Sequence, residues 1–446
     1  MQPTSDSSVA ESTLYNGATA PCRLNIIIFG AGISGLCAAF CLAKAGHTVT
    51  ILEGRANLEK IGAGIQVGPN TSRLLIRWGL KPSLGKTGVL LTHTSLLRYD
   101  NGEQLACFPY QEFGSPCYDI HRRYLVNILH DAIVPLTTLR FDTKVASINP
   151  DTTSVTLNTG EVIEADMIIG ADGVNSLTRN VVVGSPTPTI RSGDAAFRAI
   201  VDAKKMMLDL DLRPFLEKQQ LNVWLGPDRH GMNDHNVVLL HPDETEDTTI
   251  PWTRQGDIEK MRKEFSGWDL RVSKIIDLIP SGIVGPLKVL ESPLKSWVHK
   301  DGRIALTRDA CHPMLISDAL PSPPSHCQAA SMAIEDAAVL GNLFVRLTNK
   351  DQIPTVLEAY ESLRAPRAMA TADGCWKDKS TFHLPDGPAQ RARDEALKAT
   401  MAGKRSNAGQ DNNAQYEYDV DVIVDDWRMH TMSAALSTLR VDDHFH

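Results

Sequence analysis

A short apolar run followed by glycines predicts the first structural unit of the chain. Residues 24–29 are almost continuously apolar, which is the pattern of a parallel strand covered on both faces. Three glycines follow at once: Gly30, Gly32 and Gly35. Apolar residues then recur at helical spacing as far as Ala45, and Gly46 ends the predicted helix. Residues 48–52 predict a second strand, which leads to Glu53.

This unit has the form of a dinucleotide-binding site. Gly30 permits the tight turn from strand to helix, Gly32 leaves room for a pyrophosphate, and Gly35 lets the helix pack close to the sheet. The helix N-terminus offers free N–H groups to the phosphates. Glu53 is placed to accept hydrogen bonds from ribose hydroxyls and would repel a 2′-phosphate, so NADP is not expected here. A chance glycine turn is the alternative, and the complete strand-helix-strand context argues against it.

A second segment repeats the pattern of a short apolar strand followed by polar residues. Residues 166–169 predict a buried strand, and Asp172 and Gly173 follow it. Ser176 and Arg179 come next at helical spacing, which suggests a polar loop facing a ligand. Because Asp172 and Gly173 are strong turn formers, a plain turn is the alternative.

A third segment lies far downstream. Residues 303–306 predict a strand, and Asp309 lies just past its C-terminal end, where open α/β sheets place their ligands. Residues 328–347 predict a long helix whose N-terminus would favour an anion. In this order the three segments point to FAD and to one class of FAD enzyme.

Composition limits the remaining possibilities. A chain of 446 residues is too long for one small core, so two interleaved or consecutive domains are expected. The net charge of -8 argues against a nucleic-acid partner. The chain has no apolar run of membrane-spanning length and no C-x-x-C, so we expect a cytoplasmic protein with no membrane partner. Cys37 and Cys41 are predicted to be small core residues, no His/Asp/Glu cluster suggests a metal, and the oligomeric state stays open.

Further motifs carry a resemblance to a known family. They are residues 61–66 (IGAGIQ), 119–123 (DIHRR), 195–198 (AAFR), 224–227 (WLGP) and 333–337 (AIEDA). Together with the three segments they make the chain resemble the class A flavoprotein aromatic hydroxylases, of the salicylate hydroxylase-like type within the 4-hydroxybenzoate hydroxylase superfamily. The resemblance covers about residues 25–367.

The resemblance implies an α/β fold, with a Rossmann-type FAD-binding domain, an inserted α+β substrate domain with a mixed β-sheet, and a C-terminal helical region. The expected parts are a flexible N-terminal tail at 1–22, the first part of the FAD-binding domain at 23–180, the substrate-binding domain at 181–297, the second FAD part with the long helix at 298–375, and a partly flexible C-terminal extension at 376–446.

The resemblance also implies which residues serve the cofactor and the substrate. Those expected at FAD are Gly30, Gly32, Gly35, Glu53, Arg55, Gly64, Arg122, Asp172, Gly173, Asp309, Ala329 and Ala330. Arg198 would face the active site as the catalytic residue, and a surface strand arginine is the alternative there. For Arg122 the alternative is a solvated charge in the first turn of a helix.

The implied activity is that of an FAD-dependent monooxygenase. NAD(P)H reduces the flavin, O₂ adds at flavin C4a, and the resulting hydroperoxide hydroxylates a phenolic or salicylate-like small molecule or secondary metabolite. Two alternatives stay open. One is a flavin oxidase or epoxidase that acts on a non-aromatic metabolite, and the other is a catalytically impaired FAD-binding protein.

The sequence departs from the family pattern at two places. Arg308 precedes Asp309 where the family usually has glycine, and the loop at 314–327 is several residues longer than usual and is followed by Ala329 in place of glycine. We expect such a loop to seal the flavin poorly and to release hydrogen peroxide. After residue 230, a polar stretch at 231–236 replaces the longer strand that bears a tyrosine in the family.

Overall fold

A parallel five-stranded sheet carries the three segments that the sequence singled out. Its strands lie in the order β19-β12-β1-β2-β8. Their bounds are β1 (Asn25–Phe29), β2 (Thr48–Leu52), β8 (Thr138–Arg140), β12 (Met167–Gly170) and β19 (Ile304–Leu306). In the central pairing Ile28 lies opposite Ile169 on one side and Ile51 on the other. The carboxyl ends of β1, β12 and β19 therefore meet at one edge, and the strands predicted for these segments are confirmed.

The structure is a computed structural model. It describes residues 14–58, 64–233, 236–243, 254–315, 328–401 and 415–429. The long loop at 314–327 lies almost entirely outside the described residues, as do parts of the polar stretch at 231–236, of the N-terminal tail and of the C-terminal extension, and so does the side chain of Ala329.

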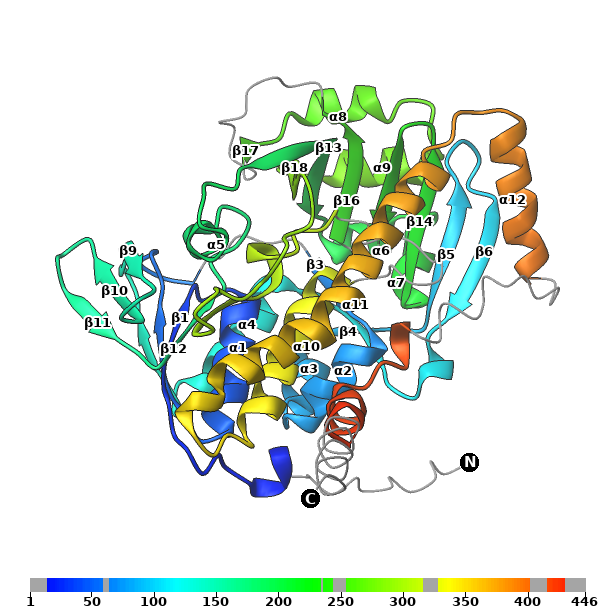
Figure 1. Ribbon diagram of the computed structural model, residues 1–446. Coiled ribbons are helices and arrows are strands. Elements are labelled where there is room, and N and C mark those ends of the chain that lie inside the picture. The colour runs from blue at the N-terminus through cyan, green and yellow to red at the C-terminus, as the bar shows by residue number, and fades with distance from the viewer. Residues whose placement is uncertain are drawn as a thin grey trace, which may run out of the picture.

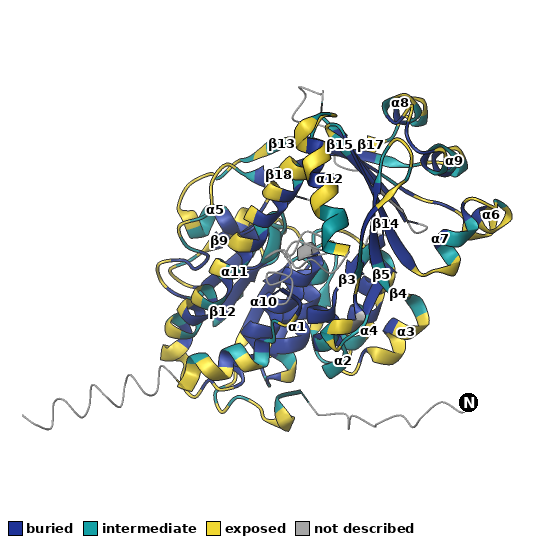
Figure 2. Cartoon of the chain, turned by 90° about the vertical axis from the view of Figure 1, so that its right-hand side faces the viewer, coloured by how far each residue is buried: buried dark blue, intermediate teal, exposed yellow. Residues whose placement is uncertain are grey.

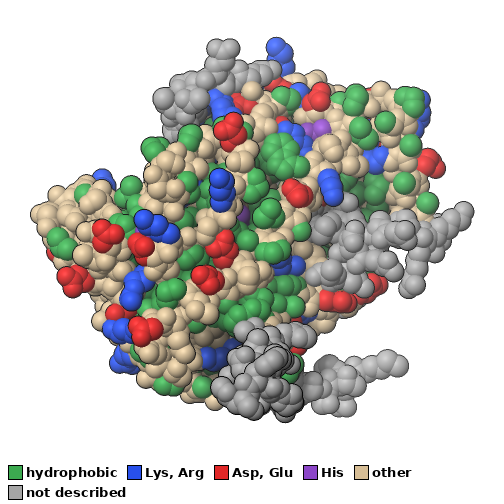
Figure 3. Space-filling model, viewed as in Figure 1, with side chains coloured by type: hydrophobic (Ala, Val, Ile, Leu, Met, Phe, Trp, Pro, Cys, Tyr) green, Lys and Arg blue, Asp and Glu red, His purple; other side chains and the backbone are tan. Residues whose placement is uncertain are grey.

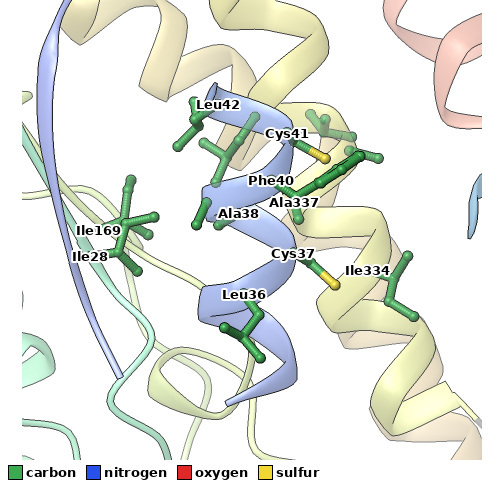
Figure 4. Packing of buried hydrophobic residues seen from close by; sticks show 14 of the residues in the cluster. Ile28, Leu36, Cys37, Ala38, Phe40, Cys41, Leu42, Ile169, Ile334 and Ala337 are labelled. Atoms are coloured by element: carbon green, nitrogen blue, oxygen red, sulfur yellow. The ribbon is translucent and has the colours of Figure 1, made fainter. Parts of the chain in front are cut away.

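Helices and a small antiparallel sheet cover the two faces of the parallel sheet (Figure 1). On one face lie α1 (Ile33–Lys44), α4 (Arg122–Ile133) and α10 (Gln328–Phe344). Figure 4 shows α1 between Ile28 and Ile169 of the sheet and Ile334 and Ala337 of α10. Cys37 and Cys41 are buried and free in this layer, as predicted. The other face packs on the strands β9 (Val145–Asn149), β10 (Ser154–Leu157) and β11 (Val162–Glu164).

The second large layer is a mixed eight-stranded sheet in the order β17-β18-β13-β16-β15-β14-β5-β6. Its strands are β5 (His93–Arg98), β6 (Gln104–Pro109), β13 (Thr189–Ile200), β14 (Gln220–Gly226), β15 (Arg229–Asn233), β16 (Asn236–Pro242), β17 (Arg254–Gln255) and β18 (Ile283–Leu290). Neighbouring strands are antiparallel except β14 and β5, which are parallel.

The two faces of this sheet pack against different partners. Phe197 belongs to a cluster with helices on the outer face: α6 (Ala203–Leu208), α7 (Arg213–Glu217), α8 (Ile258–Glu264) and α9 (Leu270–Leu278). Ala196 points to the inner face, where the cluster includes Leu315 and Phe382 from the later part of the chain. Figure 2 shows the strands buried between these layers, with exposed residues on the outward sides of the helices.

Two strands join the eight-stranded sheet from an early part of the chain. β5 and β6 fall within residues 23–180, the span assigned from sequence to the first FAD part, yet β5 pairs with β14 of the inserted segment and β6 pairs with β5. Similarly, α11 (Ile353–Phe382) is one continuous helix across the predicted boundary at 375. In Figure 1 it runs from α10 to the upper part of the eight-stranded sheet.

The remaining elements connect the layers. They are η1 (Leu14–Gly17), β3 (Gly64–Val67), α2 (Pro69–Arg77), α3 (Lys81–Thr87), β4 (Val89–Leu91), η2 (Gln111–Phe113), β7 (Cys117–His121), α5 (Leu177–Val183), η3 (Arg308–Ala310), η4 (Lys350–Gln352) and α12 (Pro388–Met401). β3, β7 and β4 form a small antiparallel sheet. Residues 420–429 are helical and reach α2, where Arg77 forms ion pairs with Asp419 and Asp421.

Charges of both signs are interspersed on the face shown in Figure 3. None of the helices in the described ranges is long and apolar enough to span a membrane. Within the same ranges no three or more His, Cys, Asp or Glu side chains are grouped so that they would hold a metal ion.

Candidate functional site

The glycine turn after β1 has three positions with different surroundings. Gly30 has a φ of +94°, and a Cβ there would lie 2.6 Å from the carbonyl oxygen of Ala171. A Cβ at Gly35 would overlap the carbonyl oxygen of Gly30. A Cβ at Gly32, by contrast, would meet nothing within 4 Å. The chain therefore packs closely around two of the glycines and leaves open space at the third, which is the arrangement that a bound pyrophosphate needs.

Glu53 lies against this turn. Its Oε2 accepts a hydrogen bond from the Ala31 N–H at 2.8 Å, and its Oε1 accepts one from the Arg55 N–H at 2.9 Å. The carboxylate is thus fixed beside the loop between β1 and α1, at the end of the neighbouring strand. An acceptor in this place suits the hydroxyls of a ribose whose phosphates lie on the glycine turn.

The third segment contacts the first turn of α1. Thr307 Oγ1 lies 3.1 Å from Ser34 Oγ, two residues after Gly32. Asp309 follows in η3, and its side chain forms an ion pair with Arg308. The loop that follows β19 and carries Asp309 therefore borders the glycine turn, although the two segments are far apart in the sequence.

The second segment reaches the same edge through Ala171, which contacts Gly30. Asp172 is bonded there to the start of α5, where its Oδ1 accepts from Oγ of the N-cap Ser176 at 2.6 Å and its Oδ2 accepts from the Thr178 N–H at 3.0 Å. Gly173 adopts a φ of +78° in the turn. The two residues therefore form a turn next to the dinucleotide site, and their contact with FAD stays a prediction.

The prediction that Ser176 and Arg179 face a ligand is wrong. Both side chains are buried, at 1% and 2% exposure. The Arg179 guanidinium donates to the carbonyl oxygens of Val174 at 2.7 Å and Ala310 at 3.2 Å, so it joins the second segment to the third. Burial outweighs the nearby Asp172 and lowers the pKa of Arg179. The helical spacing of these polar residues suggested a surface that faces a ligand. In the structure the distant partners of Arg179 are backbone carbonyl oxygens instead.

A buried charge cluster supports the third segment, and from the sequence Glu335 and Asp336 were known only as residues of a predicted helix. Asp336 of α10 accepts from the Arg308 N–H at 3.1 Å, from Arg364 Nε at 2.8 Å and lies 2.8 Å from His312 Nε2. Burial alone would raise the pKa of Asp336, but His312 and Arg364 outweigh it and hold this pKa well below its ordinary value. Glu335 pairs with Arg364 at 2.8 Å and with Arg367 at 2.7 Å.

The other predicted FAD residues lie on several elements. Gly64 begins β3, and its N–H donates to Oδ1 of Asn236 in the eight-stranded sheet at 2.8 Å. Arg122, half-buried, begins α4 directly after His121, which pairs with Gly64. Ala330 is buried in the first turn of α10. Of these positions, Gly64 directly joins its strand to the eight-stranded sheet.

Arg198 lies on the inner face of the eight-stranded sheet. It pairs with Val238 on β16, two residues after the pair of Ala196 and Leu240. Paired residues share a face, and Ala196, Val238 and Leu240 all belong to the inner cluster that contains Leu315. The predicted alternation, with Phe197 on the outer face, is confirmed.

A histidine pair, which the sequence did not indicate, joins the inner face to the end of α11. His230 Nδ1 lies 2.7 Å from His383 Nε2, and His230 is 2% exposed. Burial lowers the pKa of His383 to about 4, helped by Lys379 and Arg229. Burial, His383 and Lys379 hold the pKa of His230 well below its ordinary value. The nearby acids are already paired, Glu264 with Arg229 and Asp194 with Lys379.

Because of this histidine pair, we expect the folded protein to lose stability in mild acid. Both pKa values are lower in the folded protein, so the unfolded chain binds more protons between pH about 6.5 and 4 and the free energy of unfolding falls across that window. The variant His383→Gln should lose about 1–2 kcal/mol less over the same window. The measurement is urea unfolding at a series of pH values. His130→Gln on α4, outside the pair, should follow the wild-type curve, and an equal slope for His383→Gln would contradict the prediction.

Comparison with known proteins shows to which protein family this dinucleotide-binding chain belongs. A family model described as an FAD binding domain matches residues 23–374. The chain belongs to this family. The FAD-dependent monooxygenase OpS4 of Beauveria bassiana is 32% identical over 407 residues, which cover 87% of this chain and 92% of that protein. The 6-hydroxynicotinate 3-monooxygenase of Bordetella bronchiseptica is 31% identical over 358 residues, covering 77% of this chain and 88% of that one.

The fold agrees with this assignment. The structure of a salicylate hydroxylase substrate complex matches with a TM-score of 0.73 at 21% identity, covering 90% of this chain and 97% of that one. The expected resemblance to the aromatic hydroxylases and the expected fold class are confirmed. This protein is therefore an FAD-dependent monooxygenase, and the open space at Gly32 beside Glu53 fits its cofactor.

Proposed function

We propose that this FAD-dependent monooxygenase uses NAD(P)H and O₂ to hydroxylate a small aromatic molecule of phenolic or salicylate-like type. Two compared proteins support an aromatic substrate, because one is named for 6-hydroxynicotinate and the other for salicylate. Bound FAD supplies the redox chemistry that activates O₂. The residues of the chain hold that cofactor, orient the substrate and keep water out.

The observation that carries the proposal is the makeup of the inner face of the eight-stranded sheet. Ala196, Val238 and Leu240 make it apolar, and Leu315, three residues after His312, packs in the same cluster. Arg198 adds one cation to this face. A flat apolar ring with one anionic or phenolic oxygen matches such a surface, because the ring packs on the aliphatic side chains while the guanidinium binds the oxygen.

Arg198 is expected to orient the substrate through its planar guanidinium. The variant Arg198→Lys keeps the charge and loses the fork geometry, so kcat/KM should fall about tenfold or more while the FAD content stays normal. The measurement is steady-state oxidation of NAD(P)H together with the flavin absorbance of the purified protein.

Arg191→Lys is the matched control for this variant. Arg191 lies on the same strand and pairs with Asp243, so its exchange should leave turnover unchanged. If Arg198→Lys retains the full kcat/KM, the substrate does not contact Arg198, and the surface-strand alternative would hold instead.

The proposed function is tested by a screen of phenolic and salicylate-like acids on the purified holoprotein. Substrate-stimulated NAD(P)H consumption, oxygen uptake and a product heavier by one oxygen atom would support it. A desaturated or epoxidised non-aromatic product would favour the oxidase or epoxidase alternative. Bound FAD without any substrate-stimulated consumption would indicate a catalytically impaired FAD-binding protein.

A further inference from the structure

Arg308 is held in a backbone conformation that favours glycine. Its φ is +55°, in the left-handed region that residues with a Cβ rarely adopt. The surrounding bonds enforce it: the Arg308 N–H donates to Asp336 Oδ2 at 3.1 Å, and its carbonyl oxygen accepts from the His312 N–H at 2.7 Å and the Cys311 N–H at 2.9 Å. Backbone strain of this kind concentrates at functional sites, which indicates that the arginine side chain has a role at this position.

The strained residue borders the glycine turn. Thr307, the residue before it, contacts Ser34 in the first turn of α1 at 3.1 Å. Arg179 holds the loop from the other side through the carbonyl oxygens of Asp309 and Ala310, at 3.4 and 3.2 Å. A loop held at both sides therefore keeps Arg308 one residue from the contact with the first turn of α1.

The charges around this space explain what an arginine contributes. The diphosphate of FAD is anionic, and the carboxylate of Asp309 lies on the same loop. Like charges at close range repel each other. The Arg308 guanidinium pairs with Asp309, and its side chain remains 26% exposed.

We propose that Arg308 is a phosphate-binding residue, whose guanidinium neutralises Asp309 and donates to the diphosphate of FAD at the glycine turn. A glycine at this position would offer the backbone N–H alone, and here that N–H is bonded to Asp336. The strained backbone is the cost of this added cation. The proposal rests on FAD binding at this turn and not on the aromatic substrate.

The test compares two variants that keep a side chain at this position. Arg308→Asn removes the charge with a residue that tolerates the left-handed region, and Arg308→Lys retains the charge. The FAD dissociation constant of the stripped protein is measured by flavin fluorescence at roughly 50 and 500 mM salt. We expect a dissociation constant at least about tenfold higher for Arg308→Asn with a weaker salt dependence, and one within about threefold of wild type for Arg308→Lys.

Two further measurements exclude other causes. The melting temperature of the apoprotein should not fall in Arg308→Asn, which shows that the loss concerns the ligand and not the fold. ADP, which has a diphosphate and no flavin, should stabilise the wild type more than Arg308→Asn, whereas adenosine should stabilise both equally.

FAD binding by Arg308→Asn that equals or exceeds that of the wild type would overturn the proposal, because the arginine would then block the site. A loss of affinity in Arg308→Lys as large as that in Arg308→Asn would also overturn it, since charge would not be the cause. Wild-type protein that binds FAD but hydroxylates no aromatic compound would refute the proposed function and leave the role of Arg308 standing.

Discussion

The variant Arg364→Met is expected to lose about 3–5 kcal/mol of the free energy of unfolding. Arg364 is fully buried in α11 and pairs with Glu335 and Asp336 of α10, each at 2.8 Å. Methionine fills similar space without a charge, so one or both carboxylates would remain buried with too few partners. Since Asp336 also accepts from the Arg308 N–H, the loop at the glycine turn should loosen as well, and the FAD content should fall.

The control for this prediction is Arg140→Met. Arg140 makes an equally regular pair with Glu161, at 2.7 and 2.8 Å, but the two side chains are 35% and 47% exposed. An exposed pair contributes little to stability, because water screens both charges and the side chains lose entropy when they pair. Urea unfolding of both apoproteins measures the difference. If Arg364→Met costs no more than Arg140→Met, water or a nearby base must compensate the buried carboxylates.

Two glycine variants are expected to separate folding from cofactor binding. Gly35→Ala would place a methyl group onto the carbonyl oxygen of Gly30, which belongs to the backbone and cannot rotate away. This variant should therefore destabilise the apoprotein by about 1–3 kcal/mol or more. Gly32→Ala meets no atom within 4 Å, so the apoprotein should melt as the wild type does. The same methyl group would collide with a bound pyrophosphate, and FAD affinity should fall about 10- to 100-fold.

The measurements are the melting temperature of the apoproteins and the FAD dissociation constant by fluorescence. Gly85→Ala in α3 is the matched control, because its added methyl also meets nothing within 4 Å and lies on a different element. It should leave FAD binding unchanged. Gly32→Ala that binds FAD with wild-type affinity would place the pyrophosphate elsewhere.

Local signals in the sequence were enough to predict the core of the first unit. The residues predicted for the strands at 24–29 and 48–52 form β1 (Asn25–Phe29) and β2 (Thr48–Leu52), and the helix between them is α1. These elements are encoded by short-range periodicity and by glycines whose role depends on immediate neighbours. The same holds for the alternation on β13, where Ala196 and Phe197 point to opposite faces.

Side-chain partners far apart in the sequence were decided by the tertiary structure. Arg179 looked like a ligand-facing residue, because spacing alone does not show whether a guanidinium meets a ligand or the carbonyl oxygens of Val174 and Ala310. Likewise, β5 joins β14 across more than a hundred residues, a pairing that depends on the whole sheet and not on either strand.

Short motifs in the sequence were enough to predict the family by resemblance, the cofactor, and the strand-turn-helix unit that serves it, because that unit depends on residue types at fixed short spacings. Three features became visible only in the folded chain: Arg308 adopts a left-handed φ, Arg364 pairs with Glu335 and Asp336, and His230 contacts His383. Each of these features depends on elements that are distant in the chain and pack together in the fold. Burial removes water from these groups, so a polar group left without a protein partner would cost considerable free energy.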